Sequence, residues 1–347
     1  MRNLLRPLLV ALVAITAAGL SAPAASAAPT PTCHEYQVPV SLVPGLPATY
    51  HISGDLCLPA GHTPDTVQVL IPGATYNRTY WEFPMSRYSY VDAMTASGHA
   101  VFAMDRLDTG DSSRVLPALL SVEADALTLH QVIGALRAGD VGGTRFNKVV
   151  SVGHSLGSII AIDGAALYHD VDGMILTGFT NYVNAEFVTN TALGRVVVPT
   201  QLVQGTSPYI ENRPLGDLTT PPGGRELNFY APGTFDPAVL AADEATKDVI
   251  TVSELASFPV PQTGVESDLI TAPVFLANGQ LDFPFLCGIQ HCANSAMLKD
   301  VEAIRFAAAP SLDTFVLPNA GHDINLALDA PQFFAAAGSW MDGHFGG

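Results

Sequence analysis

The chemistry in this chain of 347 residues centres on Ser155, which stands between two glycines in the stretch "VVSVGHSLGSIIAI" (149–162). A serine hydroxyl becomes a nucleophile when a base takes its proton and a third group holds that base in the correct tautomer. In the alternative interpretation, Ser155 is only a small residue where a strand turns into a helix. The residues around Gly153 and Gly157 bear on this choice.

The surroundings of Ser155 favour the nucleophile. Such a serine needs a buried strand before it and a helix after it, because the sharp turn between them exposes the hydroxyl and glycines relieve the crowding of the strained backbone. Valines before the serine and isoleucines after it supply these elements, namely Val149, Val150, Val152, Ile159, Ile160 and Ile162. The sequence therefore predicts a strand over 148–153 that turns at Ser155 into a helix.

Buried strands alternate with helices along most of the chain. Continuous apolar runs predict strands over 66–72, 99–105, 148–153, 272–279 and 314–322 and in "GMILTGF", and helical spacing predicts helices over 89–98 and 121–139 and in "PQFFAAAGSWM". Two stretches that alternate with period two, "CHEYQVPVSL" and "ATYHISGDLCLP", precede them as an antiparallel pair. This pattern indicates an α/β fold with a mainly parallel sheet that helices cover on both faces.

With the turn at Ser155, the chain resembles the α/β-hydrolase family from the Pro72-Gly73 turn to the final helix. The family carries its triad in the order serine, acid, histidine. The resemblance implies Asp282 in "ANGQLDFP" as the acid and His322 in "LPNAGHDINL" as the base, each just beyond a predicted strand.

Other residues could take these two roles. Asp268 precedes its strand and Asp323 belongs to the loop of the histidine itself, so both are weaker alternatives to Asp282. His154 is nearer to the serine in sequence. Because adjacent side chains on a tight turn point in different directions, we expect His154 to be buried beside the turn.

The resemblance also implies backbone N–H donors for the oxyanion of a tetrahedral intermediate. Leu156 directly follows the serine, and Ala74 lies in the loop "IPGATYNRTYW" after the first core strand, with Thr75 as the second choice. The family commonly has His-Gly where this chain has Pro-Gly at 72–73. This difference removes a side-chain hydrogen bond and leaves the backbone donor.

The stretch over about 181–268 is longer than a helical crossover between parallel strands requires. Helical candidates over 236–247 and 249–257 follow a Pro/Gly-rich part. We expect a cap inserted in a single domain; the alternative is a surface excursion with no role in binding. Tyr76 and Trp81 of the core loop are expected to line an apolar cleft, together with some of the aromatic residues of the insertion. The aromatic residues of the insertion are Phe187, Tyr209, Phe229, Tyr230 and Phe235.

The first residues have the pattern of a secretory signal peptide: two arginines, an apolar run over Leu8–Leu20 and small residues up to Ala27. The run is shorter than the about 20 residues of a membrane-spanning helix, which disfavours a membrane anchor. Removing the leader, 1–27, takes away two arginines and no acid, so the formal charge of −17 becomes −19 over 28–347. A basic nucleic-acid footprint is absent.

The cysteines number four, and an even number in an exported chain suggests disulfides. The sequence-local pairs Cys33–Cys57 and Cys287–Cys292 require the least chain reach among three possible connectivities. Zinc is the alternative, because His34 and His291 adjoin cysteines, but no C-x-x-C spacing supports it. We expect no metal and no organic cofactor.

These features predict a secreted serine hydrolase that cleaves neutral, moderately hydrophobic carboxylic esters through an acyl-enzyme. The serine at the turn disfavours the dehalogenase and epoxide-hydrolase branches of the family. By the resemblance, those branches carry an aspartate at this position. Three alternatives stay open: an acyltransferase or an amidase/peptidase with the same triad, and a non-catalytic secreted binding protein on a hydrolase scaffold.

Overall fold

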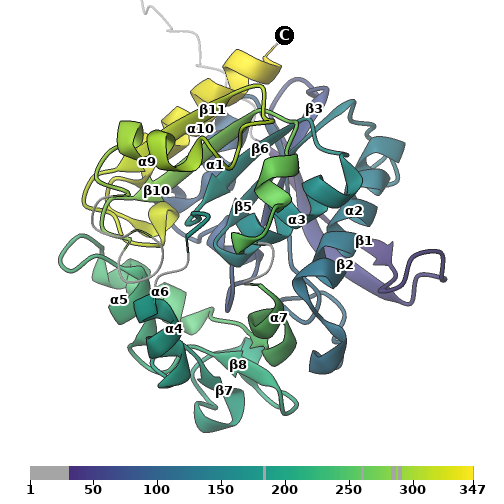
Figure 1. The fold of residues 1–347 in the computed structure, drawn as a ribbon. Coiled ribbons are helices and arrows are strands. Elements are labelled where there is room, and N and C mark those ends of the chain that lie inside the picture. The colour runs from purple at the N-terminus through teal and green to yellow at the C-terminus, as the bar shows by residue number, and fades with distance from the viewer. Residues whose placement is uncertain (1–30, 183–184, 259–261, 283–286, 288–290, 347) are drawn as a thin grey trace, which may run out of the picture.

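An eight-stranded sheet forms the centre of the computed structural model, which describes residues 31–182, 185–258, 262–282, 287 and 291–346 (Figure 1). Its strands run in the order β1-β2-β4-β3-β5-β6-β10-β11. They are β1 (Thr32–Val40), β2 (Tyr50–Leu58), β3 (Thr66–Ile71), β4 (Ala100–Met104), β5 (Lys148–His154), β6 (Gly173–Thr177), β10 (Val274–Gly279) and β11 (Leu312–Leu317). The β1–β2 and β2–β4 pairs are antiparallel and the others parallel. The predicted mainly parallel sheet is confirmed.

Helices cover both faces of this sheet: α1 (Tyr90–Ala96), α2 (Val122–Ala138), α3 (Leu156–Tyr168), α9 (Ser295–Glu302) and α10 (Ala330–Phe345). The chain moves from β3 through α1 to β4 in one direction and from β5 through α3 to β6 in the other. Because such crossovers are right-handed, α1 and α3 lie on opposite faces. Accordingly, α1 packs on α10 and α2 packs on α3.

Local sequence signals set the limits of these elements. All six residues of β3 are buried, as a strand covered on both faces requires. At the start of α2 the Ser121 side chain accepts a hydrogen bond from the Ala124 N–H over 3.2 Å, and Gly139 ends the helix with a φ of 82°.

The chain leaves the sheet between β6 and β10 and forms a second group of elements, drawn in the lower part of Figure 1. These are α4 (Ala185–Ala192), β7 (Val198–Pro199), β8 (Asp217–Thr219), α5 (Gly224–Phe229), α6 (Pro237–Ala245), β9 (Ile250–Thr251) and α7 (Val252–Ser257). The strands pair antiparallel in the order β7-β8-β9. The two expected helices correspond to α6 and α7. Strands of two or three residues are too short to show a period, so sequence reasoning missed this small sheet.

The leader, 1–27, and its expected cleavage site near Ala27 lie outside the described residues. Among the helices that the structure does describe, none is long and apolar enough to cross a membrane.

Candidate active site

Ser155 occupies the turn between β5 and α3, in a conformation that residues other than glycine seldom adopt. Its φ is 52° and its ψ is −117°. The Ser155 N–H donates to the carbonyl oxygen of Thr177 on the neighbouring strand β6 over 2.8 Å. This hydrogen bond anchors the turn to the sheet.

The two glycines around Ser155 are required by close backbone contacts. A Cβ atom at Gly153 would lie 2.4 Å from the Gly157 carbonyl oxygen, and one at Gly157 would lie 2.1 Å from the Ile71 carbonyl oxygen on β3. No side chain fits at either place. The G-x-S-x-G spacing is thus a packing requirement of this turn.

His322 and Asp282 meet at the carboxyl ends of two neighbouring strands. Asp282 follows β10 and His322 follows β11, and both side chains are buried. The His322 Nδ1 lies 3.1 Å from Asp282 Oδ1 and 3.0 Å from Oδ2. With Nδ1 paired in this way, the Nε2 atom of His322 is the nitrogen left to face the serine.

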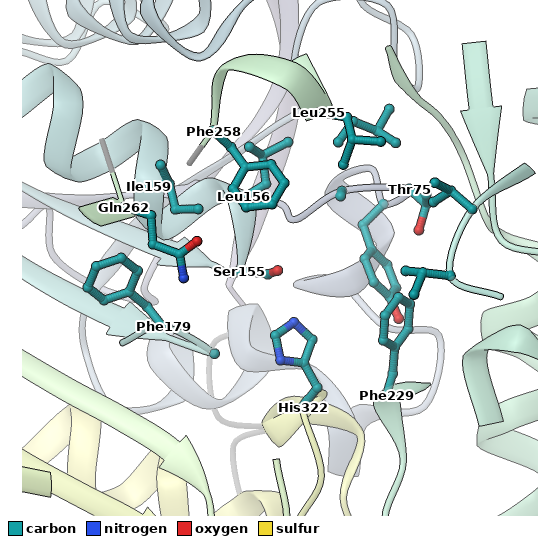
Figure 2. Close-up of a pocket in the computed structure, with 16 residues that line it drawn as sticks. Thr75, Ser155, Leu156, Ile159, Phe179, Phe229, Leu255, Phe258, Gln262 and His322 are labelled. Atoms are coloured by element: carbon teal, nitrogen blue, oxygen red, sulfur yellow. The ribbon is translucent and has the colours of Figure 1, made fainter. Parts of the chain in front are cut away.

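Ser155 and His322 line the same pocket, and Figure 2 shows the His322 ring below the Ser155 hydroxyl with a nitrogen toward it. Burial lowers the pKa of His322, but the charges of Asp282 and Asp323 and the hydrogen bond to Asp282 outweigh it and raise the pKa above its ordinary value of 6.5. The arrangement can therefore hold a proton on the histidine beside a hydroxyl.

The residues that competed for these roles lie elsewhere. Asp268 pairs with Arg305 over 3.0 Å. Asp323 Oδ1 lies 3.2 Å from His154 Nε2, and its Oδ2 accepts a hydrogen bond of 2.5 Å from the Tyr76 hydroxyl. Burial and the nearby His322 lower the pKa of His154 well below 6.5, so His154 is neutral. The expected burial of His154 beside the turn matches the structure.

The loop after β3 lies against Ser155 and presents an amide to the pocket. Thr75, the second choice as an oxyanion donor, donates its N–H to the Val249 carbonyl oxygen over 3.3 Å and so is engaged. Within the described part of the chain, the Ala74 N–H donates no backbone hydrogen bond, and Leu156, as the first residue of α3, has no partner within its helix. Ala74 and Leu156 both line the pocket.

Two buried arginines hold the carbonyl groups of Gly73 and Thr75, the residues on either side of Ala74. Arg106 Nη2 donates to the Gly73 carbonyl oxygen over 3.3 Å, and Arg225 Nη2 donates to the Thr75 carbonyl oxygen over 2.5 Å. A trans peptide is planar, so the Gly73 carbonyl and the Ala74 N–H point in opposite directions. Holding the carbonyl on Arg106 therefore aims the Ala74 N–H.

The pocket beside Ser155 is lined mainly by apolar groups. Its apolar walls come both from the core and from the segment between β6 and β10; they include Leu156, Ile159, Phe179, Val196, Val197, Phe229, Ile250, Leu255 and Phe258. Gln262 adds an amide to this lining.

Tyr76 lines the pocket as expected, but Trp81 does not. Trp81 is fully buried in the core, where its ring makes T-shaped contacts with the rings of Tyr80 and Tyr90. A short helix over Arg78–Tyr80 turns the chain inward before Trp81, which corrects the expectation.

Among the aromatic residues of the insertion, Phe229 lines the pocket, with its ring centre 5.6 Å from that of His322. Tyr230 instead donates a hydrogen bond of 2.9 Å to Asp243, and Phe235 packs on the Tyr230 ring. The side chain of Phe187 is outside the described residues.

A buried polar network lies behind the pocket, and sequence reasoning missed it. The Tyr80 ring stacks on His154 at 4.3 Å between centres. Asp323 lies between His154 and the Tyr76 hydroxyl, whose oxygen is also 3.3 Å from Asp243 Oδ2. Arg225 donates to Asp243 over 2.7 Å. No sequence spacing signals these contacts, because the partners come from distant parts of the chain.

Both predicted disulfides are present. Cys33 and Cys57 face each other in the register of β1 and β2. Cys287 donates its N–H to the Asp282 carbonyl oxygen over 3.0 Å, which ties the second disulfide to Asp282. Over the residues that the structure describes, no cluster of metal-binding side chains occurs.

The sequence over 68–337 matches the model of a family described as "Alpha/beta hydrolase family". The chain belongs to the α/β-hydrolase family. No curated protein matches it in sequence.

Solved structures of an esterase, a lipase and an epoxide hydrolase resemble the chain in fold. An esterase from Thermogutta terrifontis is 16% identical, with 90% of this chain and 99% of that chain covered and a TM-score of 0.56. A monoacylglycerol lipase from Paleococcus ferrophilus is 17% identical, with 85% and 99% covered and a TM-score of 0.52. The epoxide hydrolase CorEH is 14% identical, with 90% and 99% covered and a TM-score of 0.52. At these identities the likeness concerns the fold alone.

Proposed function

We propose that this α/β-hydrolase is a secreted esterase that cleaves neutral, moderately hydrophobic carboxylic esters. The observation that carries the proposal is the shared pocket of Ser155 and His322, with Asp282 paired to the far side of the His322 ring. A serine at a strained turn, a histidine and a buried carboxylate are the groups that acyl transfer through a covalent intermediate needs.

In the proposed mechanism, Ser155 Oγ attacks the carbonyl carbon of the ester while its proton passes to His322 Nε2. The carbonyl oxygen becomes an oxyanion that accepts hydrogen bonds from the N–H groups of Ala74 and Leu156. When the tetrahedral intermediate collapses, the bond to the alcohol oxygen breaks, and the alcohol leaves with the proton from His322. Asp282 stabilises the imidazolium that exists between these two transfers.

The second half of the reaction repeats these steps with water. A water molecule gives a proton to His322 Nε2 and attacks the carbonyl carbon of the acyl-enzyme. The new oxyanion collapses, the acid leaves, and Ser155 Oγ takes the proton back from His322.

The segment over about 181–268 is proposed to act as a cap that shapes the binding site. It supplies apolar groups such as Phe229, Leu255 and Phe258 to the pocket, which supports this role. An apolar site with few polar groups suits a small, neutral, moderately hydrophobic ester. Secretion is proposed from the leader, 1–27, and the two disulfides are compatible with an oxidising compartment.

The test combines labelling with turnover. A fluorophosphonate probe is expected to label the protein at Ser155, and p-nitrophenyl esters of graded acyl length are expected to be hydrolysed, while Ser155→Ala loses both. Labelling that persists in Ser155→Ala would contradict the assignment of the nucleophile. Labelling at Ser155 without any ester hydrolysis would contradict the esterase and point to an acyltransferase, an amidase or a binding protein.

A further inference from the structure

Gln262 is a polar group of the pocket whose hydrogen-bonding capacity the protein leaves half used. The residue is only 2% exposed and lines the pocket. Its Nε2 donates to the carbonyl oxygens of Thr180 over 3.2 Å and Tyr182 over 3.5 Å. Among the described residues, none donates to its Oε1.

The contacts of Nε2 determine which way the Gln262 amide faces. A flipped amide would place its oxygen against the carbonyl oxygens of Thr180 and Tyr182, and three acceptors would then face one another with no proton between them. The nitrogen must therefore lie on that side. Figure 2 shows the amide reaching from the side of Phe179 toward Ser155, with its oxygen toward the pocket.

The surroundings make this oxygen selective. Ile159, Phe179 and Phe258 line the pocket together with Gln262 and offer no hydrogen-bond donor from their side chains. A buried acceptor that stays unpaired is unfavourable, and a hydrogen bond gains strength in apolar surroundings. A ligand that brings a donor forms a hydrogen bond with the Gln262 oxygen. A purely apolar ligand instead excludes water from this oxygen and offers no hydrogen bond in its place.

We propose that Gln262 selects esters that carry a neutral hydrogen-bond donor, a hydroxyl or an amide N–H, on the part of the substrate that lies between Ser155 and Phe179. This inference rests on the proposed ester hydrolysis and refines its substrate class. A neutral donor is specified because the apolar lining offers no counter-charge to a cation.

The experiment uses pairs of esters that differ only in a hydroxyl for a methyl group. In the acyl arm, p-nitrophenyl 3-hydroxybutyrate is compared with p-nitrophenyl 3-methylbutyrate. In the alcohol arm, 2-hydroxyethyl butyrate is compared with propyl butyrate. The ratio of kcat/KM within each pair is measured in the wild type and in Gln262→Leu, so that intrinsic differences in ester reactivity cancel between the proteins.

The hydroxyl-to-methyl ratio is expected to fall by about 3- to 10-fold in Gln262→Leu, the range of one neutral hydrogen bond, in the arm whose donor reaches the amide. The arm that responds tells whether the donor belongs to the acid or the alcohol. Phe258→Leu is the matched control: it changes the shape of the same pocket and keeps the acceptor, so its ratio should equal that of the wild type.

Gln262→Met provides a second variant whose side chain is closer in length to glutamine than leucine is; like leucine, it removes the hydrogen bonds to Thr180 and Tyr182 together with the acceptor. Circular dichroism shows whether each variant is folded. The inference is overturned if the hydroxyl-to-methyl ratio of kcat/KM is equal in wild type and variant in both arms. It is also overturned if the wild-type ratio, divided by the ratio of the alkaline hydrolysis rates of the same two esters, is below one in both arms. If the wild type hydrolyses none of the four esters, the proposed function itself fails.

Discussion

The guanidinium of Arg225 donates a hydrogen bond of 2.5 Å to the Thr75 carbonyl oxygen and lies 4.1 Å from the centre of the Tyr76 ring. Thr75 has a φ of 63°, which a non-glycine residue adopts only when its surroundings hold it there. Arg225 comes from the segment between β6 and β10, and Asp243 of the same segment fixes it over 2.7 Å. The segment thus holds the loop that presents the Ala74 amide.

Arg225→Lys is expected to lower kcat by about 10- to 100-fold. Losing an oxyanion donor outright costs about 10²- to 10³-fold, and this substitution only displaces the proposed donor, Ala74. Lysine keeps the positive charge beside Asp243, but it lacks the second nitrogen with which arginine also reaches the Thr75 carbonyl oxygen. The measurement is kcat and KM for a p-nitrophenyl ester, with circular dichroism to confirm the fold. Arg305→Lys, at the Asp268 pair, is the control and should leave kcat nearly unchanged. A lower Tm with an unaltered kcat would make Arg225 a purely structural residue.

The pH dependence of ester turnover should follow His322. The imidazole must be neutral to accept the serine proton, so kcat/KM falls on acidification through its pKa. Asp282 and Asp323 raise that pKa above 6.5, so the fall of kcat/KM on the acidic side of the pH profile is expected to have its midpoint above pH 6.5. Asp282→Asn removes a charge and the acceptor that selects the tautomer, and is expected to lower kcat by about 10⁴-fold. A flat profile between pH 5 and 8, with chemistry rate-limiting, would exclude His322 as the base.

The stability of the fold is expected to decrease as the pH rises from mildly acidic to alkaline values. Burial raises the pKa of Asp217 to about 7, that of Asp243 to about 7 and that of Glu82 to about 9. Each group has a higher pKa in the folded than in the unfolded chain. The stability that it contributes is therefore fully present below the unfolded pKa of about 4 and is lost as the pH rises through the folded value.

Urea unfolding at pH 5, 7 and 9 measures this effect. The free energy of unfolding should fall across the series, and Asp217→Asn should flatten the fall between pH 5 and 7, because an amide has no proton to lose. Asp300→Asn, at a solvent-exposed carboxylate, is the control and should keep the wild-type slope. Stability that rises from pH 5 to 9 would contradict the prediction.

The two disulfides are expected to have separate effects. Cys33–Cys57 closes a separation of 24 residues and Cys287–Cys292 one of 5, so loop-closure entropy favours the first as the larger contributor to stability. The second adjoins Asp282 through the Cys287 N–H. Alanine at both members of the second pair should lower kcat/KM more than Tm. Alanine at both members of the first pair should do the reverse, and equal effects would show that neither disulfide supports the acid.

The sequence predicted those parts of the molecule whose cause is local. Gly153 and Gly157 could be interpreted because a sharp turn excludes any Cβ atom there. Asp282 and His322 were implied by the resemblance to the α/β-hydrolase family, and the parallel strands β10 and β11 bring them to one edge of the sheet. Apolar runs indicated the strands of the sheet, since burial on both faces leaves no polar positions.

The parts that it missed depend on contacts between distant residues. Arg225 meets Thr75 across 150 positions, and Tyr80 stacks on His154 through a turn that no period reveals. Trp81 was expected in the pocket because it shares a loop with Tyr76, but the direction of a side chain in an irregular loop depends on how that loop packs. Charge pairs in the core leave no periodic trace either.

Acyl-length preference tests the role of the pocket walls. Each further buried methylene contributes up to about 0.8 kcal/mol, so kcat/KM should rise by up to about 4-fold per methylene from acetate until the pocket is filled. Phe258→Ala enlarges the pocket on the side of the insertion, and the preferred acyl chain should become longer. The measurement is kcat/KM for p-nitrophenyl acetate, butyrate, hexanoate and octanoate.

Phe235→Ala is the matched control, because this aromatic residue of the same segment packs on Tyr230 outside the pocket lining. It should leave the preferred length as in the wild type, although it lowers stability by removing buried area. Replacing the whole segment would instead break the Arg225 contact to Thr75, so point variants separate binding from the support of the oxyanion loop. A wild-type preference for acetate, or an optimum that Phe258→Ala leaves unmoved, would mean that the core loop around Tyr76 selects the acyl chain.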